Sequence, residues 1–129
     1  MQTRGLHLRA NAEYIVPSYM TEITFEEFKK AEIRIGTILS AEKVPDADKL
    51  IKLMINTGDE SPRQILSGIA EHYPDTSVLV GKQVPVLANL PTRTIRGIES
   101  QGMVLYAVGD GFLTTIEPSR EIPPGTNVQ

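Results

Sequence analysis

The clearest secondary-structure signal in the chain is the stretch Ile33-Arg34-Ile35-Gly36-Thr37-Ile38-Leu39-Ser40. Apolar or β-branched side chains occupy every second position from Ile33 to Leu39, which is the pattern of a half-buried β-strand. Gly36 lies inside this pattern, and an isolated glycine in a strand predicts a bulge or a sharp bend. Because small barrels need such bends, the stretch favours a strand of a small β-barrel.

More short strands follow along the chain. We expect them at residues 50–56, 64–67, 83–88, 103–108 and 112–116. Gly109-Asp110-Gly111, between the last two, is typical of a hairpin turn. Pro85 has no N–H to donate, so it places its strand at a sheet edge or at the rim of a barrel. Residues 68–73 are expected to form one or two turns of helix, which Pro74 ends.

A short helix is predicted before the first strand. Thr24 is the expected N-cap, and Glu27, three residues later, completes a capping box. The helix should end near Ala31. Residues 1–19 show no clear period and are expected to form an irregular or disordered leader, and Met20 looks like a more natural start of the chain.

Together these elements predict an all-β fold with short flanking helices. Five or six short strands, with a small helix between the third and the fourth, match the Greek-key barrel called the OB-fold. A generic small barrel is the alternative that the strand count leaves open. We expect one domain, residues 20–129, whose proline-rich end forms a C-terminal extension.

Composition excludes several classes of function. The 129 residues include no cysteine and two histidines, so thiol catalysis is excluded and a metal site is not expected. Neither a phosphate-binding glycine motif nor a catalytic triad is recognisable, and we expect neither enzymatic activity nor a cofactor. No stretch approaches the roughly 20 apolar residues of a membrane span, and a cytoplasmic location is expected. The net charge of −3 means that any nucleic-acid binding must come from a local basic patch.

Such a patch is predicted in the run Asn89-Leu90-Pro91-Thr92-Arg93-Thr94-Ile95-Arg96-Gly97-Ile98-Glu99-Ser100-Gln101-Gly102-Met103. It joins the guanidinium groups of Arg93 and Arg96 to a polar turn, Ser100-Gln101, bracketed by glycines. Arginines and short polar side chains beside a rigid strand suit contacts to a phosphate backbone. Two solvated surface arginines are the structural alternative.

Four blocks of sequence resemble the tRNA-binding domain that occurs alone and fused to aminoacyl-tRNA synthetases. They are Glu32-Ile33-Arg34-Ile35-Gly36-Thr37-Ile38, Pro45-Asp46-Ala47-Asp48-Lys49-Leu50, Leu66-Ser67-Gly68-Ile69-Ala70 and the run through Met103. The resemblance covers about residues 23–128. It implies an OB-fold, usually dimeric when free-standing, that binds tRNA mainly by shape at the outer corner of the molecule.

The resemblance and the residue chemistry together give a set of candidate tRNA-binding residues. They are Lys49, Ser67, Asn89, Arg93, Arg96, Ser100, Gln101 and Met103. Several have a structural alternative. Ser67 is first expected as a helix cap, Asn89 as a partner of its own turn backbone and Met103 as a core residue. Ser100 has an alternative as a turn-stabilising serine, and Lys49 as the neutralising partner of two nearby aspartates.

We therefore expect a non-catalytic tRNA-binding module, acting alone or as a β-type subunit of a methionyl-tRNA synthetase. The alternative is a dimeric, chaperone-like peptide-binding protein of the same fold family, and a purely structural interaction domain is a third possibility. The expected partners are tRNA, the catalytic chain of a methionyl-tRNA synthetase and a second copy of the chain. The apolar residues after Gly111, which include Phe112, Leu113, Ile116, Ile122 and Val128, are too many for a five-stranded barrel to bury, and this favours a homodimer.

Overall fold

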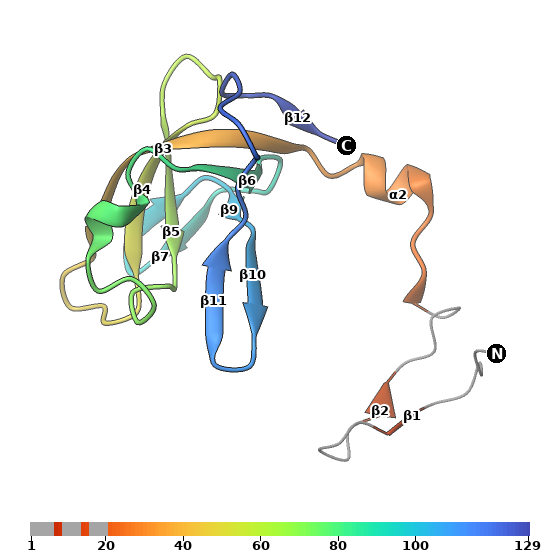
Figure 1. The fold of residues 1–129 in the computed structure, drawn as a ribbon, viewed down its shortest axis with the longest axis horizontal. Helices are drawn as coiled ribbons and strands as arrows, with labels where there is room; N and C mark the ends of the chain where they lie inside the picture. Colours follow the sequence, from red (N-terminus) through yellow and green to blue (C-terminus); the bar gives the residue numbers. More distant parts are fainter. Residues whose placement is uncertain (1–6, 9–13, 16–20) are drawn as a thin grey trace. The chain divides into compact units, whose positions relative to one another are not determined.

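β3 (Ile33–Lys43) is the longest described strand of the computed structural model, and the barrel is built around it (Figure 1). Its first residues pair with β12 (Asn127–Val128) on one side and with β6 (Gln83–Leu87) on the other. Further along, β3 pairs with β4 (Ile51–Asn56). All three pairings are antiparallel. The strand predicted at residues 33–40 is thus confirmed and continues to Lys43.

The structure describes residues 7–8, 14–15 and 21–129, which fall into two compact units, 1–30 and 31–129. In the first unit, β1 (His7–Leu8) pairs antiparallel with β2 (Tyr14–Ile15). The leader, predicted to be irregular, therefore contains a short β-ladder. Its remaining residues, and the predicted start at Met20, lie outside the described residues.

The first unit also contains the helix α2 (Phe25–Lys29), which ends two residues before the predicted end. The predicted capping box is confirmed. The Glu27 N–H donates to Thr24 Oγ1, and the Thr24 N–H donates to Glu27 Oε1, both at 3.1 Å. These two bonds satisfy amide groups that have no partner inside a helix.

The second unit is a nearly closed antiparallel barrel. The strand order in its main sheet is β5-β4-β3-β6-β9, and the β-hairpin β10–β11 extends away from this sheet (Figure 1). The elements not yet bounded are β5 (Arg63–Ser67), the 3₁₀ helix η1 (Thr76–Leu79), β7 (Arg93–Ile95), β8 (Ile98–Ser100), β9 (Met103–Val104), β10 (Tyr106–Gly109) and β11 (Phe112–Thr115). β7 and β8 form a hairpin of their own.

A single apolar core fills the barrel. Alternate residues of β4, which are Ile51, Leu53 and Ile55, are fully buried, while Lys52 is not. This is the predicted period of two, which places one face of the strand in the core. Buried side chains from β3, β5, β6 and η1 complete the core cluster, and Tyr106 and Leu113 pack against its rim.

Gly36 has a different role from the predicted one. The register of β3 against β4 shifts between Ile38 and Ser40, so the bulge lies at Leu39 and not at the glycine. At Gly36, a Cβ atom would lie 2.5 Å from Ile55 Cγ2, which is closer than any side chain tolerates. Glycine is therefore needed because the neighbouring strand packs closely against the backbone, which is the other reason for a glycine inside a strand.

The interpretation of Pro85 as a marker of an edge strand is wrong, because β6 lies between β3 and β9. Pro85 lies opposite Ile35 in the ladder between β6 and β3. The N–H and C=O of Ile35 bond instead to Thr126 and Gly125, on the opposite side of β3. The Ile35–Pro85 pair is therefore not a hydrogen-bonded one, and the missing N–H costs no bond to β3. β9 pairs only with Val86 and Leu87 on the other side of β6.

Two further predictions are corrected. Residues 68–73 form turns rather than a helix, and the helical element between β5 and β6 is η1, which Asp75 caps by accepting from the Ser77 N–H at 3.1 Å. The strand predicted at 103–108 is interrupted at Leu105, whose N–H bonds to Pro85. The break allows β9 to finish the barrel sheet while β10 turns away into the hairpin with β11.

Candidate nucleic-acid interface

The run from Asn89 to Ser100 forms an arm that joins β6 to β9. Its outer part is the β7–β8 hairpin, in which Arg93 lies opposite Ser100 and Ile95 opposite Ile98. The two residues of its turn are Arg96 and Gly97, with φ of +54° and +77°. Positive φ at both central positions is the geometry of a type I′ turn, whose twist matches that of the flanking strands.

The arm packs on the loop that joins β3 to β4, residues 44–50. Ile95 and Ile98 from the hairpin contact a small apolar cluster formed by Val44, Ala47 and Leu66. At the tip of the arm, Arg96 Nη1 donates to the carbonyl oxygen of Asp46 at 3.3 Å. Two segments that are 50 residues apart in sequence therefore form one surface.

This surface brings together the predicted basic residues. The side chains of Lys49, Arg93 and Arg96 are exposed on the loop and the arm. In the described part of the chain, Arg93 and Lys49 take part in no side-chain hydrogen bond or ion pair, so both charges are available to a ligand. The exposed acidic groups nearby are Asp46, Asp48 and Glu99. The surface is thus mixed in charge, with the guanidinium groups on the projecting hairpin.

Ser100 and Gln101 lie where the barrel closes. Ser100 is buried, with 4% of its surface exposed, and its Oγ accepts from the Leu66 N–H at 3.0 Å. The Gln101 N–H donates to the Gln64 carbonyl at 2.8 Å, and Gln101 Oε1 accepts from the Gln64 N–H at 2.9 Å. These bonds join the free edge of β5 to the returning end of the arm, so both residues have a structural role there.

Ser67 is buried as well, and the prediction that it caps a helix is wrong because no helix follows it. Its Oγ accepts a hydrogen bond from the Tyr106 hydroxyl at 2.9 Å. Burial raises the pKa of the Tyr106 phenol to about 12, and the bond to Ser67 partly offsets this. The pair therefore anchors the start of β10 to the end of β5.

Asn89 lies at the start of the arm, and Met103 lies beyond its returning end. Asn89 Oδ1 accepts from the Glu32 N–H at 2.9 Å, so it joins the start of the arm to the segment before β3. Met103 is 43% exposed on β9, so the interpretation as a core residue is wrong. Its thioether lies on the surface beside the returning end of the arm, where it is available to a ligand.

A cluster of charged side chains that was not predicted from sequence lies at the neck of the arm, where Ala88 and Gln101 meet. Asp59 accepts from Arg34 Nη1 at 3.0 Å, from Arg63 Nε at 2.9 Å and from Thr57 Oγ1 at 2.7 Å. The hydrogen bond from Arg63 is the largest cause that holds the pKa of Asp59 at about 2, well below its usual value. Arg63 Nη1 also donates to the carbonyl oxygens of Ala88 and Gln101. No spacing rule predicts this cluster, since its members come from β3, β5 and the loop between β4 and β5.

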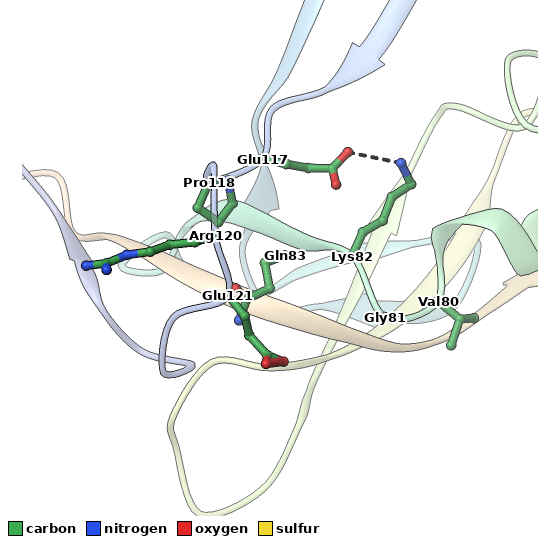
Figure 2. A pocket seen from close by; sticks show the side chains of 8 residues that line it. All are labelled: Val80, Gly81, Lys82, Gln83, Glu117, Pro118, Arg120 and Glu121. Carbon is green, nitrogen blue, oxygen red and sulfur yellow. Dashed lines mark hydrogen bonds and ion pairs between the residues drawn. The ribbon is translucent and has the colours of Figure 1, made fainter.

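A hollow of about 390 Å³ lies between the start of β6 and the tail segment that follows β11 (Figure 2). Lys82 and Glu117 form an ion pair across it at 3.0 Å, and Thr115 also donates to Glu117. These bonds, led by the one from Thr115, lower the pKa of Glu117. The Lys82–Glu117 ion pair joins the tail to the barrel, and Arg120 and Glu121 also line the hollow.

The described residues contain no group of three histidine, cysteine, aspartate or glutamate side chains that could hold a metal ion. Over those same residues, no helix is long and apolar enough to cross a membrane. The surface formed by the arm and loop 44–50 offers hydrogen-bond donors and the positive charges of Lys49, Arg93 and Arg96.

The model of one protein family, "Putative tRNA binding domain", matches residues 33–127. The chain belongs to this family. The matched residues extend from β3 to β12 and so include nearly the whole second unit. The OB-fold and the family resemblance predicted from sequence are confirmed.

Two relatives of this tRNA-binding domain are methionine–tRNA ligases. The one from Porphyromonas gingivalis is 51% identical over 109 residues, which cover 84% of this chain and 16% of the ligase. The one from Archaeoglobus fulgidus is 52% identical over 107 residues, which cover 83% of this chain and 16% of the ligase. The chain thus spans only a small part of the length of these relatives.

Two solved structures share both fold and sequence with the domain. A methionyl-tRNA synthetase related protein from Pyrococcus horikoshii has a TM-score of 0.77 and 36% identity, over 84% of this chain and 98% of its own. The chaperone CsaA of Bacillus anthracis has a TM-score of 0.74 and 30% identity, over 84% of this chain and 99% of its own.

Proposed function

We propose that this protein is a non-catalytic tRNA-binding module that recognises the shape and phosphate backbone of tRNA. The observation that carries the proposal is the packing of the arm on loop 44–50, which presents Arg93, Arg96 and Lys49 on one surface. In the OB-fold, the loop between strands 1 and 2 and the loop between strands 4 and 5 flank the nucleic-acid-binding face. Here these two loops are residues 44–50 and the arm.

Phosphate contacts explain this surface better than base readout does. A guanidinium group pairs with phosphate oxygens through two parallel hydrogen bonds. No aromatic residue occurs between Asn89 and Leu105, so the arm has no platform on which bases stack. We therefore expect different tRNAs to bind with similar affinity. A spread beyond about a hundredfold, roughly 2.7 kcal/mol, would indicate base readout.

The remaining candidate residues fit this role in two groups. Gln101 and Met103 are exposed at the returning end of the arm, and Asn89 is exposed at its start. We propose that they contact ribose or backbone next to the two arginines. Ser67 and Ser100 are buried, so we propose that they support the surface through their hydrogen bonds and touch RNA only if the arm moves on binding.

A methionyl-tRNA synthetase catalytic chain is the proposed partner. The likeness to the methionine–tRNA ligases supports a role as an accessory tRNA-binding part of such an enzyme, and we propose that it acts in the cytoplasm. Holding tRNA near a catalytic chain raises its effective concentration without new chemistry. Adding the protein to a synthetase that lacks this domain should lower the KM for tRNA and leave kcat unchanged.

A second copy of the chain is a further proposed partner. An apolar groove of about 330 Å³ runs along the outside of the barrel. Ile116 and Val128, which line this groove, keep 45% and 39% of their surface exposed, and Phe112 on the β10–β11 hairpin keeps 55%, as the sequence predicted for the tail, whereas Leu113 packs against the core. A twofold dimer would bury this surface isologously and place two RNA sites on one particle. The groove is lined by Ile33, Ile35, Pro85, Leu105, Ile116, Glu117, Pro118 and Val128.

The experiment that tests the proposed function compares three ligands under one buffer condition: tRNA, duplex RNA and an unfolded peptide. We expect tRNA to bind at least tenfold more tightly than a duplex of equal length, because the duplex has the charge but not the shape. Tighter binding of the unfolded peptide would support the alternative function, to which the likeness to the chaperone CsaA lends weight.

A further inference from the structure

The guanidinium group of Arg63 bonds to both ends of the arm. Ala88 follows β6 directly and is the last residue before the arm, and Gln101 is the first residue after it. Arg63 Nη1 donates to the carbonyl oxygen of Ala88 at 2.7 Å and to that of Gln101 at 3.2 Å. One side chain thus closes the neck through which the arm leaves and re-enters the barrel.

Asp59 holds this guanidinium group in its orientation. Its Oδ2 accepts from Arg63 Nε at 2.9 Å and from Thr57 Oγ1, while its Oδ1 accepts from Arg34 Nη1. The carboxylate therefore ties Arg63 to β3, which is the central strand of the barrel. The low pKa of Asp59 agrees with this, because the carboxylate stays charged under all physiological conditions.

The two ends of the arm differ in how else they are held. The returning end, residues 99 and 100, and the following Gln101 are bonded to the edge of β5 through Gln64 and Leu66. The outgoing end is bonded to the segment before β3 through Asn89 and the Ala88 N–H. The pairing of Leu87 with Met103 brings these ends together, and the Arg63 side chain bonds to both of them, so it restrains the arm at its neck.

We propose that Arg63 is a positioning residue for RNA binding, which sets the direction in which the arm presents Arg93 and Arg96. The inference rests on the proposed tRNA-binding function. Arg63 has only 20% of its side chain exposed, and its hydrogen bonds go to protein oxygens. It therefore acts through the arm and not by neutralising a phosphate. Lysine cannot replace it, because a single ammonium group does not reproduce the planar fork.

Two kinds of variant separate positioning from charge. In Arg63→Met and Arg63→Lys, tRNA affinity should fall at least tenfold, while the slope of log affinity against log salt stays as in wild type, because no phosphate contact is lost. Arg120→Met is the matched control, since it removes the same charge from the tail and should leave the affinity within twofold. Hydrogen exchange should accelerate in residues 93–100 and stay unchanged in β3, which a general loss of stability would not produce.

Asp59→Asn gives the sharper test, because positioning and simple electrostatics predict opposite signs. Removing a negative charge from the protein should strengthen RNA binding if charge alone matters. Loss of the anchor for Arg63 should instead weaken binding several-fold. This variant keeps the Arg63 guanidinium, so it can distinguish positioning from charge even if Arg63→Met does not fold.

Each outcome has one meaning. Weaker binding by all three variants at unchanged salt slope supports the inference. Unchanged affinity in folded Arg63→Met, a salt slope flattened by about one unit, or tighter binding by Asp59→Asn would overturn it, although the proposed function would stand. If wild-type protein does not bind tRNA, the proposed function itself fails, so the two failures are distinguishable.

Discussion

Arg96 occupies a backbone conformation that suits asparagine or glycine better than arginine, so its replacement should make the protein more stable and a weaker RNA binder. Its φ is +54°, in the left-handed region, where a residue with an ordinary side chain pays about 1 kcal/mol. Asn-Gly is a favoured pair for the type I′ turn found here. Arg96→Asn loses only the bond to the Asp46 carbonyl, which contributes about 0.5 kcal/mol, the low end of the range for a hydrogen bond, because it is exposed and 3.3 Å long.

The net expectation for Arg96→Asn is a gain of roughly 0.5 kcal/mol in the free energy of unfolding, or about 2 °C in Tm. The affinity for tRNA should fall by about 1–3 kcal/mol, since one charge-assisted phosphate contact is lost. Thermal unfolding followed by circular dichroism and fluorescence anisotropy with labelled tRNA measure the two quantities. A lower Tm with unchanged affinity would refute the reasoning, because it would show that Arg96 stabilises the turn and does not bind RNA.

Three further predictions concern assembly, pH and packing. Ile116→Asp places a charge in the apolar groove, so it should convert the proposed dimer to a monomer, as measured by light scattering. Val78→Asp, at an equally exposed apolar position outside the groove, should leave the dimer intact. A monomeric wild type would refute the proposed dimer. Because the pKa of Asp59 is depressed, its carboxylate should stabilise the folded state above about pH 4, and this stabilisation should be lost as the pH falls toward 2. The loss in the free energy of unfolding should be about 1 kcal/mol after allowance for the partial exposure of Asp59, and acid titration of Asp59→Asn should lack this part of the transition. Gly125→Ala should lower the free energy of unfolding by about 2–3 kcal/mol, because the φ of Gly125 is +91° and a Cβ would lie 3.0 Å from the Thr57 carbonyl oxygen. Gly111→Ala, which has positive φ but open space around it, should lower it by only about 1 kcal/mol. Equal urea midpoints for the two variants would contradict the packing argument.

The parts of the fold that could be predicted from sequence are those set by local pattern. Alternation in β4 places one face of that strand in the core, and the capping box of α2 needs only two side chains three residues apart. Both signals are complete within a few residues. The element between β5 and β6 was misplaced because Pro74 was interpreted as the end of a helix, whereas Asp75 begins the 3₁₀ turn that follows it.

The candidate site could be predicted from sequence only where it depends on a local pattern. The run 89–103 predicted an exposed basic segment, because two arginines beside a polar turn are unusual in an acidic chain, and Arg93 and Arg96 are exposed in the structure. Its hairpin was missed because Arg96-Gly97 lacks the asparagine or aspartate that marks a type I′ turn. The neck formed by Asp59 and Arg63 depends on where Ala88 and Gln101 meet in space, and closure of a barrel brings together residues that no local period relates.

The salt dependence of tRNA binding by the double variant Arg93→Ala, Arg96→Ala tests the central claim most directly. Wild-type affinity should fall with salt along a log–log slope of roughly −2 to −4, as expected for about three to five phosphate contacts. The double variant should remain folded by circular dichroism, bind tRNA at least tenfold more weakly and show a slope flatter by about two units. A folded double variant with unchanged affinity and unchanged slope would show that the arm does not bind RNA, and it would contradict the account.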